Sequence, residues 1–511
     1  MELQFLGHAG WLATNKNFKA LFDPWFNPQG CFFNEWFPFP NNAHLFTPEL
    51  CCDLDFIYIS HPHEDHFDKW FLNHIKKTVP IFIPNFRDKT LLHDLQELGF
   101  KTIVEFDDDD AAIVKGILVK IIKLEGYLES DSCILLDDDC SKILNLNDCH
   151  IAFSKLKRVI GDVDVLLLQC SNAIWFPCCY EYSEEKMAEH GKNKRQNILN
   201  RALKYAKTLN AKKVIPNAGP PIFRSPQHDR WNYSRRDISN PFGLMQDSVK
   251  YFHQEGIDAS LVIPGSTISL NNNEIVVNSN TEEVANIYDD VDAYTTEYLK
   301  EIRSRNIEPP VVSEQELISV VPKFIKHIEK MFKISLFYVE KIKFPVLFDF
   351  QDRGRILVDF PKKTISEYVN QPYNYSFTFD PALVAQLFRN KTIDFETYFL
   401  SCNFSCKRSP DIYTEALFTL LKHFDIKRFA TSERIYGERQ SSFEETFEKT
   451  HEGKTYKIQK YCPHMFADLE EVGYFDDENN FCCPLHGWKF DCKTGECQNK
   501  NNFRLLIENI T

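Results

Sequence analysis

The chain has 511 residues, 43% of them hydrophobic, and a formal net charge of −14. This length suffices for two to four domains with cores of their own, and the hydrophobic content excludes a disordered chain. The acidic balance argues against a nucleic-acid partner, because phosphate binding draws on basic surface. No apolar run approaches the roughly twenty residues of a membrane span, and Met1 is not followed by a signal peptide, so we expect a cytoplasmic protein.

Residues 1–285 alternate short strand-like runs with amphipathic stretches, which is typical of an α/β domain. The clearest strands are expected at Leu3–Leu6, Phe56–Ser60, Val163–Gln169 and Lys213–Ile215. The clearest helix is expected at Arg195–Leu209, where the apolar residues share one face. We therefore predict one α/β domain over residues 1–285.

A dense set of possible metal ligands follows the strand Phe56–Ser60. The sequence there is His61-Pro62-His63-Glu64-Asp65-His66. Side chains that project from a loop at the carboxyl end of a strand can converge on one point. Three imidazoles and the Asp65 carboxylate within six residues are too dense for an ordinary solvated turn. The sequence therefore predicts a metal site formed by His61, His63, Asp65 and His66.

Residues 286–430 carry no recognisable chemical motif. Their first part is helical and charged, which predicts a helical linker. Strands are then expected at Ile334–Val339, Arg355–Asp359 and Tyr375–Phe379, and helices at Pro381–Phe388 and Tyr413–Lys422. This order predicts a small α+β unit after the linker.

Residues 431–511 contain two short Cys/His pairs, Cys462-Pro463-His464 and Cys483-Pro484-Leu485-His486. Two thiolates and two neutral imidazoles can hold the two irons of a [2Fe–2S] cluster. The alternative is tetrahedral zinc, although zinc fingers seldom pair one Cys with one His at each knuckle. With Gly487-Trp488 after the second pair, the pattern resembles the all-β Rieske domain, in which Cys462, His464, Cys483 and His486 would bind the cluster.

The His61–His66 segment resembles the metal-binding signature of the metallo-β-lactamase fold, an αββα sandwich. Gly7-His8-Ala9-Gly10 and Leu21-Phe22-Asp23-Pro24 match one branch of that superfamily, the lactonases acting on ascorbate 6-phosphate and their relatives. The fold usually places a metal-bridging aspartate after the strand expected at Ile143–Leu146. The resemblance therefore implies that Asp148 is a ligand, and Asp65 and Asp148 become the candidate catalytic carboxylates.

The chain departs from the hydrolytic members of that fold at two ligand positions. No His occurs from 94 to 149, where the third motif would lie, and Asp131 or Ser130 stands near that place. Asn217 stands where a fifth-motif His would follow the strand ending at Ile215. The remaining ligands are His61, His63, Asp65, His66 and Asp148. They suit one metal ion with open positions, as in non-haem iron centres that bind O₂, or a loosely held pair.

The combination of a Rieske domain with this front domain resembles the CMP-N-acetylneuraminate hydroxylases. The resemblance rests on the Rieske ligands, on His61–His66 and on the segment 144–149. It implies hydroxylation of a nucleotide sugar, with electrons from NADH through a cytochrome b5 system. The domain order departs from that family, whose Rieske domain is N-terminal. No Gly-x-Gly-x-x-Gly follows a strand, so we expect an external donor, namely a reductase, a ferredoxin or a cytochrome b5-like protein.

An arginine-rich loop after Gly219 is a candidate for binding an anionic small molecule, because arginines grip phosphate or carboxylate and aromatic rings stack on bases. The substrate-binding candidates are Asn217, Arg224, His228, Arg230, Trp231 and Arg235. The alternative is an exposed loop whose arginines pair with the acidic surface.

Three functions compete on this evidence. The first is an oxygenase with iron in the front site. The second is a zinc hydrolase, such as a lactonase or phosphodiesterase, whose Rieske domain senses redox state. The third is an electron carrier whose front domain only docks a partner, although such a module has no need for the intact His/Asp set.

Overall fold

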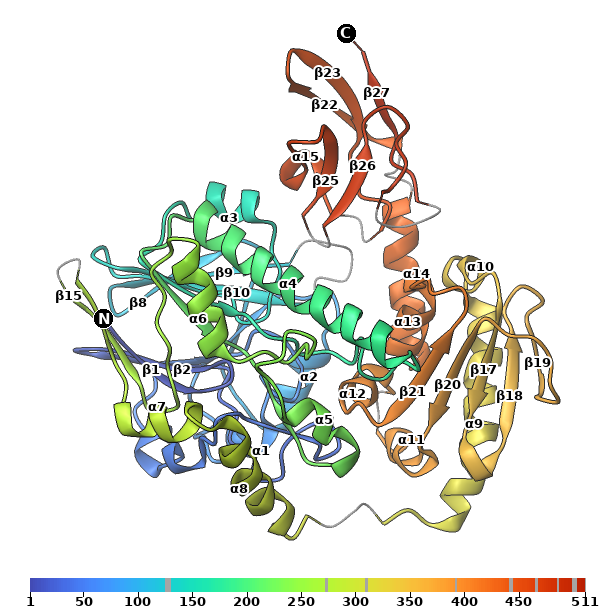
Figure 1. Cartoon of the computed structure of the whole chain (residues 1–511), viewed down its shortest axis with the longest axis horizontal. Helices are drawn as coiled ribbons and strands as arrows, with labels where there is room; N and C mark the ends of the chain where they lie inside the picture. Colours follow the sequence, from blue (N-terminus) through green and yellow to red (C-terminus); the bar gives the residue numbers. More distant parts are fainter. Residues whose placement is uncertain are drawn as a thin grey trace.

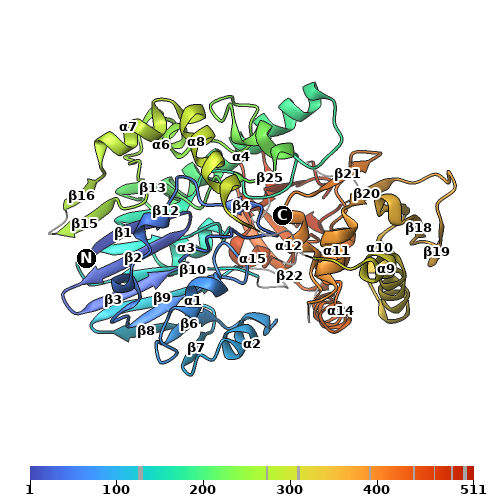
Figure 2. The same ribbon diagram turned by 90° about the horizontal axis from the view of Figure 1, so that it is seen from below.

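A computed structural model of the chain describes residues 1–124, 130–271, 274–307, 311–390, 393–440, 444–464, 467–484, 487–498 and 503–510. Figure 1 shows three parts: a layered front unit at the left, a middle unit with one sheet at the right, and a C-terminal unit that stands above both. Seen from below in Figure 2, the front and middle units again lie side by side.

Two sheets form the centre of the front unit. Over the described residues, the larger has eight strands in the order β16 (Glu274–Asn278), β15 (Thr267–Asn271), β1 (Glu2–Gly7), β2 (Gly10–Asn15), β3 (Phe18–Phe22), β5 (Phe56–Tyr58), β6 (Ile81–Pro84) and β7 (Ile103–Phe106). The smaller, counted over the same residues, has six in the order β13 (Lys213–Asn217), β12 (Val165–Gln169), β11 (Lys142–Asn145), β10 (Ser132–Asp137), β9 (Ile117–Lys123) and β8 (Ala111–Val114).

The two sheets bury their facing side chains in one core, because alternate residues of a strand point to the same face. Phe5 and Tyr58 of the larger sheet share this core with Ile121, Ile134 and Leu167 of the smaller. The outer faces are covered by helices. These are α1 (Lys69–Asn73) and α2 (Thr90–Glu97) on one side, and α3 (Phe153–Val159), α4 (Glu184–Thr208) and α6 (Met245–Gln254) on the other. The αββα sandwich of the metallo-β-lactamase fold, predicted from the sequence, is confirmed.

Helices α7 (Thr281–Tyr288) and α8 (Val291–Ser304) also belong to the packing of the sandwich. Leu299 and Ile302 of α8 share a buried cluster with Phe37 and Ile222 of the front unit. The boundary predicted at residue 285 therefore falls inside α7, and α8 packs on the front unit where the sequence suggested a linker. The predicted boundaries 1–285, 286–430 and 431–511 stay predictions.

The middle unit is a sheet covered by helices, as the sequence predicts. Its strand order is β19 (Thr364–Glu367), β18 (Arg355–Asp359), β17 (Pro345–Asp349), β20 (Tyr375–Phe379) and β21 (Phe404–Arg408). The helices are α9 (Glu314–Ile334), α10 (Tyr338–Lys341), α11 (Pro381–Leu387), α12 (Phe395–Leu400), α13 (Glu415–Lys422) and α14 (Ile426–Gln440).

The strand predicted at Ile334–Val339 is wrong. Helix α9 runs on to Ile334, and α10 begins at Tyr338. The backbone N–H groups of Leu336, Phe337 and Tyr338 donate to the carboxylate of Glu433, at 2.8–3.0 Å. These donors have a side-chain acceptor, so this largely apolar segment does not need a neighbouring strand.

Main-chain and charged contacts fix the middle unit to the sandwich. The N–H of Cys406 in β21 donates to the carbonyl of Cys179 at 2.7 Å, and the N–H of Glu181 donates to the carbonyl of Cys406 at 2.8 Å. Arg428 of α14 contacts Asp88 of the sandwich and Asp394, both at 2.9 Å. A short segment of the front unit thus extends the sheet of the middle unit.

Over its described residues from 444 onward, the C-terminal unit is all-β apart from one helical turn. Its strands β22 (Thr446–His451), β23 (Lys454–Gln459) and β27 (Ile507–Asn509) pair in one sheet, and β24 (Tyr474–Phe475), β25 (Asn480–Cys483) and β26 (Trp488–Asp491) in another. It packs on α3 and α4, where the Phe153 and Tyr474 rings lie 5.2 Å apart and Arg158 contacts Glu471 at 3.2 Å.

Within the part of the chain that the structure describes, no helix combines the length and the apolar character needed to cross a bilayer.

A strained loop, Cys31–Trp36, closes the sandwich next to the middle unit. Phe32, Phe33 and Asn34 have φ values of 50°, 60° and 63°, a region that non-glycine residues seldom occupy. The loop is held through buried Glu35, whose carboxylate accepts from the Ser225 N–H at 3.0 Å and from its hydroxyl at 2.6 Å. Burial raises the pKa of Glu35 to about 7, although Ser225 opposes that shift.

Glu35→Gln should therefore remove a pH-dependent loss of stability. A carboxyl whose folded pKa lies above its ordinary value favours the folded state when protonated. As pH rises from about 4.5 to about 7, deprotonation of native Glu35 therefore lowers the free energy of unfolding, by about 3 kcal/mol in total. Thermal unfolding at pH 5 and pH 8 tests this. We expect similar melting temperatures for both proteins at pH 5 and a higher one for Glu35→Gln at pH 8; a lower one at pH 8 would contradict it.

Candidate metal centres

Five loops meet at one edge of the sandwich, each following a strand. They carry His8 after β1, Asp23 after β3, His61–His66 after β5, Asp148 after β11 and Asn217 at the end of β13. His8, Asp23, Asn147 and Ala218 all have φ between 40° and 51°. Such left-handed residues are uncommon outside glycine and concentrate at functional sites. The backbone is thus bent sharply at four points around the same place.

His66 lies at the centre of this cluster and is fully buried. Its Nε2 is 3.6 Å from Asp148 Oδ1 and 3.7 Å from Asp65 Oδ2. On the other side of the ring, Nδ1 donates to Asp23 Oδ2 at 2.9 Å. A carboxylate that holds one ring nitrogen in this way fixes the tautomer and leaves the other nitrogen for a metal.

His61 and His63 face each other beside this centre. His61 Nε2 and His63 Nδ1 are 2.9 Å apart, and His61 Nδ1 lies 3.2 Å from Asp131 Oδ1. Two imidazole nitrogens bound to one ion at about 2.0–2.1 Å lie roughly 3 Å apart. The separation therefore suits a shared ion. Asp131 lies where the sequence lacks a third-motif histidine.

The donors form two overlapping groups. His8, Asp65 and His66 place ligand atoms within 4.8 Å of one another, and so do His61, His66 and Asp148. His8 Nε2 contacts Asp65 Oδ2 at 2.9 Å. His8 is thus a candidate ligand in addition to the predicted ones, while His63 and Asp131 lie beside His61 but belong to neither group. The sequence contained a signal for each, the His8 turn after the first strand and the Asp131 substitution, but neither position was predicted to bind metal.

Buried polar atoms without a hydrogen-bond partner show that this donor set fits a cation. They include His8 Nδ1, Asp65 Oδ1, His66 Nε2 and Asp148 Oδ1. Leaving such atoms buried and unpaired costs free energy, so native structures seldom tolerate several together. An ion bound by His nitrogens and carboxylate oxygens would satisfy them. The chemistry of the donors suits iron or zinc.

The charges of the cluster also match a metal site. Burial alone would raise the pKa of Asp65, but His66 and His8 hold it well below its ordinary value. Burial likewise opposes ionisation of Asp148, while His66 and His61 lower its pKa. Burial raises the pKa of Asp131, which His61 only partly offsets. Asp65 and Asp148 are therefore the carboxylates that are ionised most readily.

One carboxylate comes from the middle unit. Glu396 of α12 places Oε2 3.3 Å from His63 Nε2 and 2.5 Å from Lys422 Nζ of α13. Burial opposes the ionisation of Glu396, yet Lys422 and His63 hold its pKa well below the ordinary value. No local pattern in the sequence marks Glu396, because only the tertiary packing of the two units brings it to the histidines.

A cavity of about 900 Å³ opens between the sandwich and the middle unit. His61, His63, Asp131 and Asp148 line one side of it. The opposite side is lined by Asp394, Glu396, Lys422 and Arg428. A volume of this order accommodates a small-molecule substrate. Part of the donor set therefore lines a cavity shared by two units.

The structure does not bring the predicted arginine loop to this cavity, because its residues have other partners. Buried Arg235 donates to the Pro221 carbonyl at 2.6 Å, and Arg230 pairs with Glu184 at 2.9 Å. None of the described residues Arg224, His228, Arg230, Trp231 and Arg235 lines the cavity. Asn217 alone lies at the cluster, where the next residue, Ala218, donates its N–H to the His8 carbonyl at 2.8 Å.

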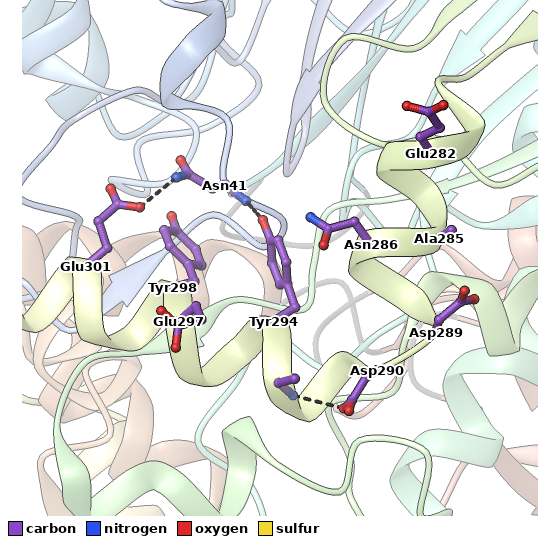
Figure 3. Close-up of a pocket in the computed structure, with 11 residues that line it drawn as sticks. Asn41, Glu282, Ala285, Asn286, Asp289, Asp290, Tyr294, Glu297, Tyr298 and Glu301 are labelled. Carbon is purple, nitrogen blue, oxygen red and sulfur yellow. Dashed lines mark hydrogen bonds between the residues drawn. The ribbon is translucent and has the colours of Figure 1, made fainter.

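A second cavity, of about 940 Å³, lies between α7 and α8 (Figure 3). Its lining carries five carboxylates, from Glu282, Asp289, Asp290, Glu297 and Glu301. Asn41 lies at its edge and donates to Glu301 at 3.2 Å. It contains none of the predicted site residues, so the cavity beside His61 is the stronger candidate.

The structure describes three of the four predicted cluster ligands in the C-terminal unit. Cys462 and His464 follow β23, and buried Cys483 ends β25, where it pairs with Trp488 of β26. The His464 and Trp488 rings stack at 4.1 Å with an angle of 6° between planes. His464 Nε2 contacts Glu415 of α13 at 3.1 Å. The predicted fourth ligand, His486, lies outside the described residues.

Comparison with known proteins identifies the two later parts of the chain. Residues 430–506 match the Rieske [2Fe–2S] domain, and residues 320–438 match the Rv3818-like, SCP2-like domain. The C-terminal unit is thus a Rieske domain, as the sequence predicts.

Relatives extend the comparison to the whole chain. The Rieske 2Fe-2S iron-sulfur protein Rv3818 of Mycobacterium tuberculosis is 30% identical over 523 residues, which cover 97% of this chain and 98% of that protein. Cytidine monophosphate-N-acetylneuraminic acid hydroxylase of Danio rerio is 26% identical over 234 residues, or 43% of this chain and 38% of that protein. The solved structure of CmlA, a diiron beta-hydroxylase from Streptomyces venezuelae, covers 53% of this chain and 54% of its own, at 18% identity and a TM-score of 0.38. The chain belongs to the family of Rieske [2Fe–2S] iron–sulfur proteins that includes Rv3818.

Proposed function

We propose that this protein is a Rieske-coupled oxygenase that hydroxylates a small metabolite in the cavity between the sandwich and the SCP2-like unit. The observation that carries the proposal is the buried donor set around His66. It contains several unsatisfied polar atoms, its members His61, His63 and Asp148 line that cavity, and the same chain has a Rieske domain. A Rieske cluster passes single electrons, so a chain that has one needs an acceptor. The partial similarity to a hydroxylase supports the same reaction class.

The residues around His66 would have different roles in binding a metal ion: some would be ligands, and others would orient the ligands. His61, His63, His66, Asp65 and Asp148 would be its ligands, with His8 and Asp131 close enough to complete a second position. Iron in such a set, reduced by electrons from the Rieske domain, would supply O₂ activation. Asp23 holds the His66 ring by its Nδ1. Glu396 and Lys422 close the side of the cavity opposite the sandwich.

The substrate and the electron donor are the finer parts of this proposal. The sequence predicts an anionic, nucleotide-sugar-like substrate and an external donor such as a reductase, a ferredoxin or a cytochrome b5-like protein. The arginine-rich loop after Gly219 does not support an anionic substrate, because none of its described candidate residues lines the cavity. An anionic substrate would depend on Arg389, Lys422 and Arg428 in the lining and on the charge of the bound metal.

The alternative is a hydrolase, and one observation favours it. The two donor groups together contain five residues, His8, His61, Asp65, His66 and Asp148, and a set of this size could hold two ions side by side, with His66 bound to one of them. Two-metal sites activate a bridging water in many hydrolases. In that case the Rieske domain would sense redox state, and turnover would need no electrons.

Changing Asp23 to Ala should weaken metal binding without touching a ligand. The His66 ring would lose the carboxylate that fixes its tautomer, and losses of this kind typically cost 10–100-fold in metal affinity. Competition with a coloured chelator measures the Zn²⁺ affinity of the front site in protein that contains the [2Fe–2S] cluster. Asp55→Ala is the control, because Asp55 accepts from the Lys19 N–H at 2.9 Å at the start of the β5 strand. Equal affinities for the two variants would count against the assigned role.

Changing Asp148 to Asn should separate the two functions. In an oxygenase, a dithionite-reduced cluster is reoxidised by O₂ through the front site, so we expect the variant to be reoxidised at least tenfold more slowly. Stopped-flow absorbance of the cluster gives both rates. Asp139→Asn, in the exposed turn between β10 and β11, is the matched control. Unchanged reoxidation in Asp148→Asn, with the front metal lost, would favour the hydrolase.

A further inference from the structure

Helix α13 of the SCP2-like unit contacts the Rieske domain at its first residue. Glu415 places Oε2 3.1 Å from Nε2 of His464, a predicted cluster ligand. Its other oxygen, Oε1, accepts from the Thr419 hydroxyl one turn along, at 3.4 Å. Because Nε2 makes the contact with Glu415, Nδ1 is the ring nitrogen that would bind iron. A carboxylate thus lies directly behind a ligand of the cluster.

The last residue of the same helix contacts the front site. Lys422 lies 2.5 Å from Glu396, whose same oxygen lies 3.3 Å from Nε2 of His63. Glu396 and Lys422 both line the cavity beside the metal cluster. An ion bound through His63 would therefore change the electrostatic potential at Glu396 and Lys422.

The helix between these two contacts is rigidly held. Its six central residues, 416–421, are all buried, and Leu417, Leu420 and Leu421 are completely enclosed. An α-helix rises about 1.5 Å per residue, so the seven steps from Glu415 to Lys422 span about 10 Å. The acidic residue stands at the N-terminus and the basic residue at the C-terminus, the ends that the helix dipole favours. Neither contact can shift without moving a packed element.

We propose that α13 couples the Rieske cluster to the front metal site within one chain, through Glu415 at one end and the Lys422–Glu396 pair at the other. The charge state of one centre then changes the properties of the other. The residues Glu415, Lys422 and Glu396 are positioning residues, since they act through His464 and His63. The coupling deepens the proposed oxygenase function, but it concerns equilibrium properties and needs no turnover.

The test is a redox titration of the cluster, followed by EPR, with and without Zn²⁺ in the front site. Zn²⁺ adds positive charge near His63 and does not change its own oxidation state. We expect it to raise the midpoint potential of the cluster, and linkage then requires Zn²⁺ to bind the reduced protein more tightly by the same factor. A coupling of roughly tenfold, ordinary for linked sites, equals about 59 mV for a one-electron couple.

Lys422→Met should remove the coupling while both centres still load, because it breaks the link to Glu396 without changing a ligand. Lys422→Arg keeps the charge and should retain the coupling. Glu415→Gln should raise the potential even without Zn²⁺, because the negative charge beside His464 is lost. If Lys422→Met fails to load, Glu415→Gln still tests the other end, where we also expect the Zn²⁺ effect to be lost. Glu329→Gln, on the exposed side of α9, is the control and should leave the potential and the Zn²⁺ effect unchanged.

Two results would overturn the proposal. One is a cluster potential in the native protein that Zn²⁺ does not move. The other is a Zn²⁺ effect that persists in full in Lys422→Met or in Glu415→Gln, which would mean that the centres interact by another route. A failure of the oxygenase proposal would look different, since O₂ chemistry could be absent while the Zn²⁺ effect remained.

Discussion

Burying several imidazoles and carboxylates at one edge of a sandwich costs free energy unless their charges are compensated. His66 is the buried residue on which this compensation depends. Asp23 satisfies one of its ring nitrogens, while the other lies near two carboxylates and has no hydrogen bond. The sharply bent backbone at His8, Asp23, Asn147 and Ala218 serves the same cluster. The sandwich is thus organised to hold a cation, and the remainder of the site follows from where that cation would lie.

The middle unit turns this edge into one side of a cavity. The segment around Cys179 pairs with β21, and Arg428 contacts acids on both sides of the boundary. These contacts fix the cavity and bring Glu396 to His63. The same unit also contacts the Rieske domain through Glu415. A unit without any chemical motif of its own therefore shapes the site and lies between the two centres.

Local motifs were predictable from the sequence, and long-range contacts were not. The His61–His66 segment and the Cys/His pairs could be found because their ligands lie within a few residues of each other. The α/β character of the first domain was predictable because strands and helices alternate with clear periodicity, and its αββα sandwich was implied by the resemblance of the His61–His66 segment to the metallo-β-lactamase fold. His8, Asp131 and Glu396 lie far apart in the chain, so only the tertiary fold shows that they meet. The prediction that the arginine-rich loop binds substrate found no support in the structure for a related reason, since composition does not reveal where a loop lies in the fold. The strand wrongly predicted at Ile334–Val339 shows that one carboxylate can satisfy several backbone N–H groups of a largely apolar run.

The most direct test of the account is a metal count combined with EPR on anaerobically purified protein. We expect two irons in a cluster with a Rieske-type signal after dithionite reduction, and at least one further iron per chain bound by the residues around His66. Zinc in place of that further iron would contradict the oxygenase, and a protein without a Rieske signal would contradict both the oxygenase and the proposed coupling.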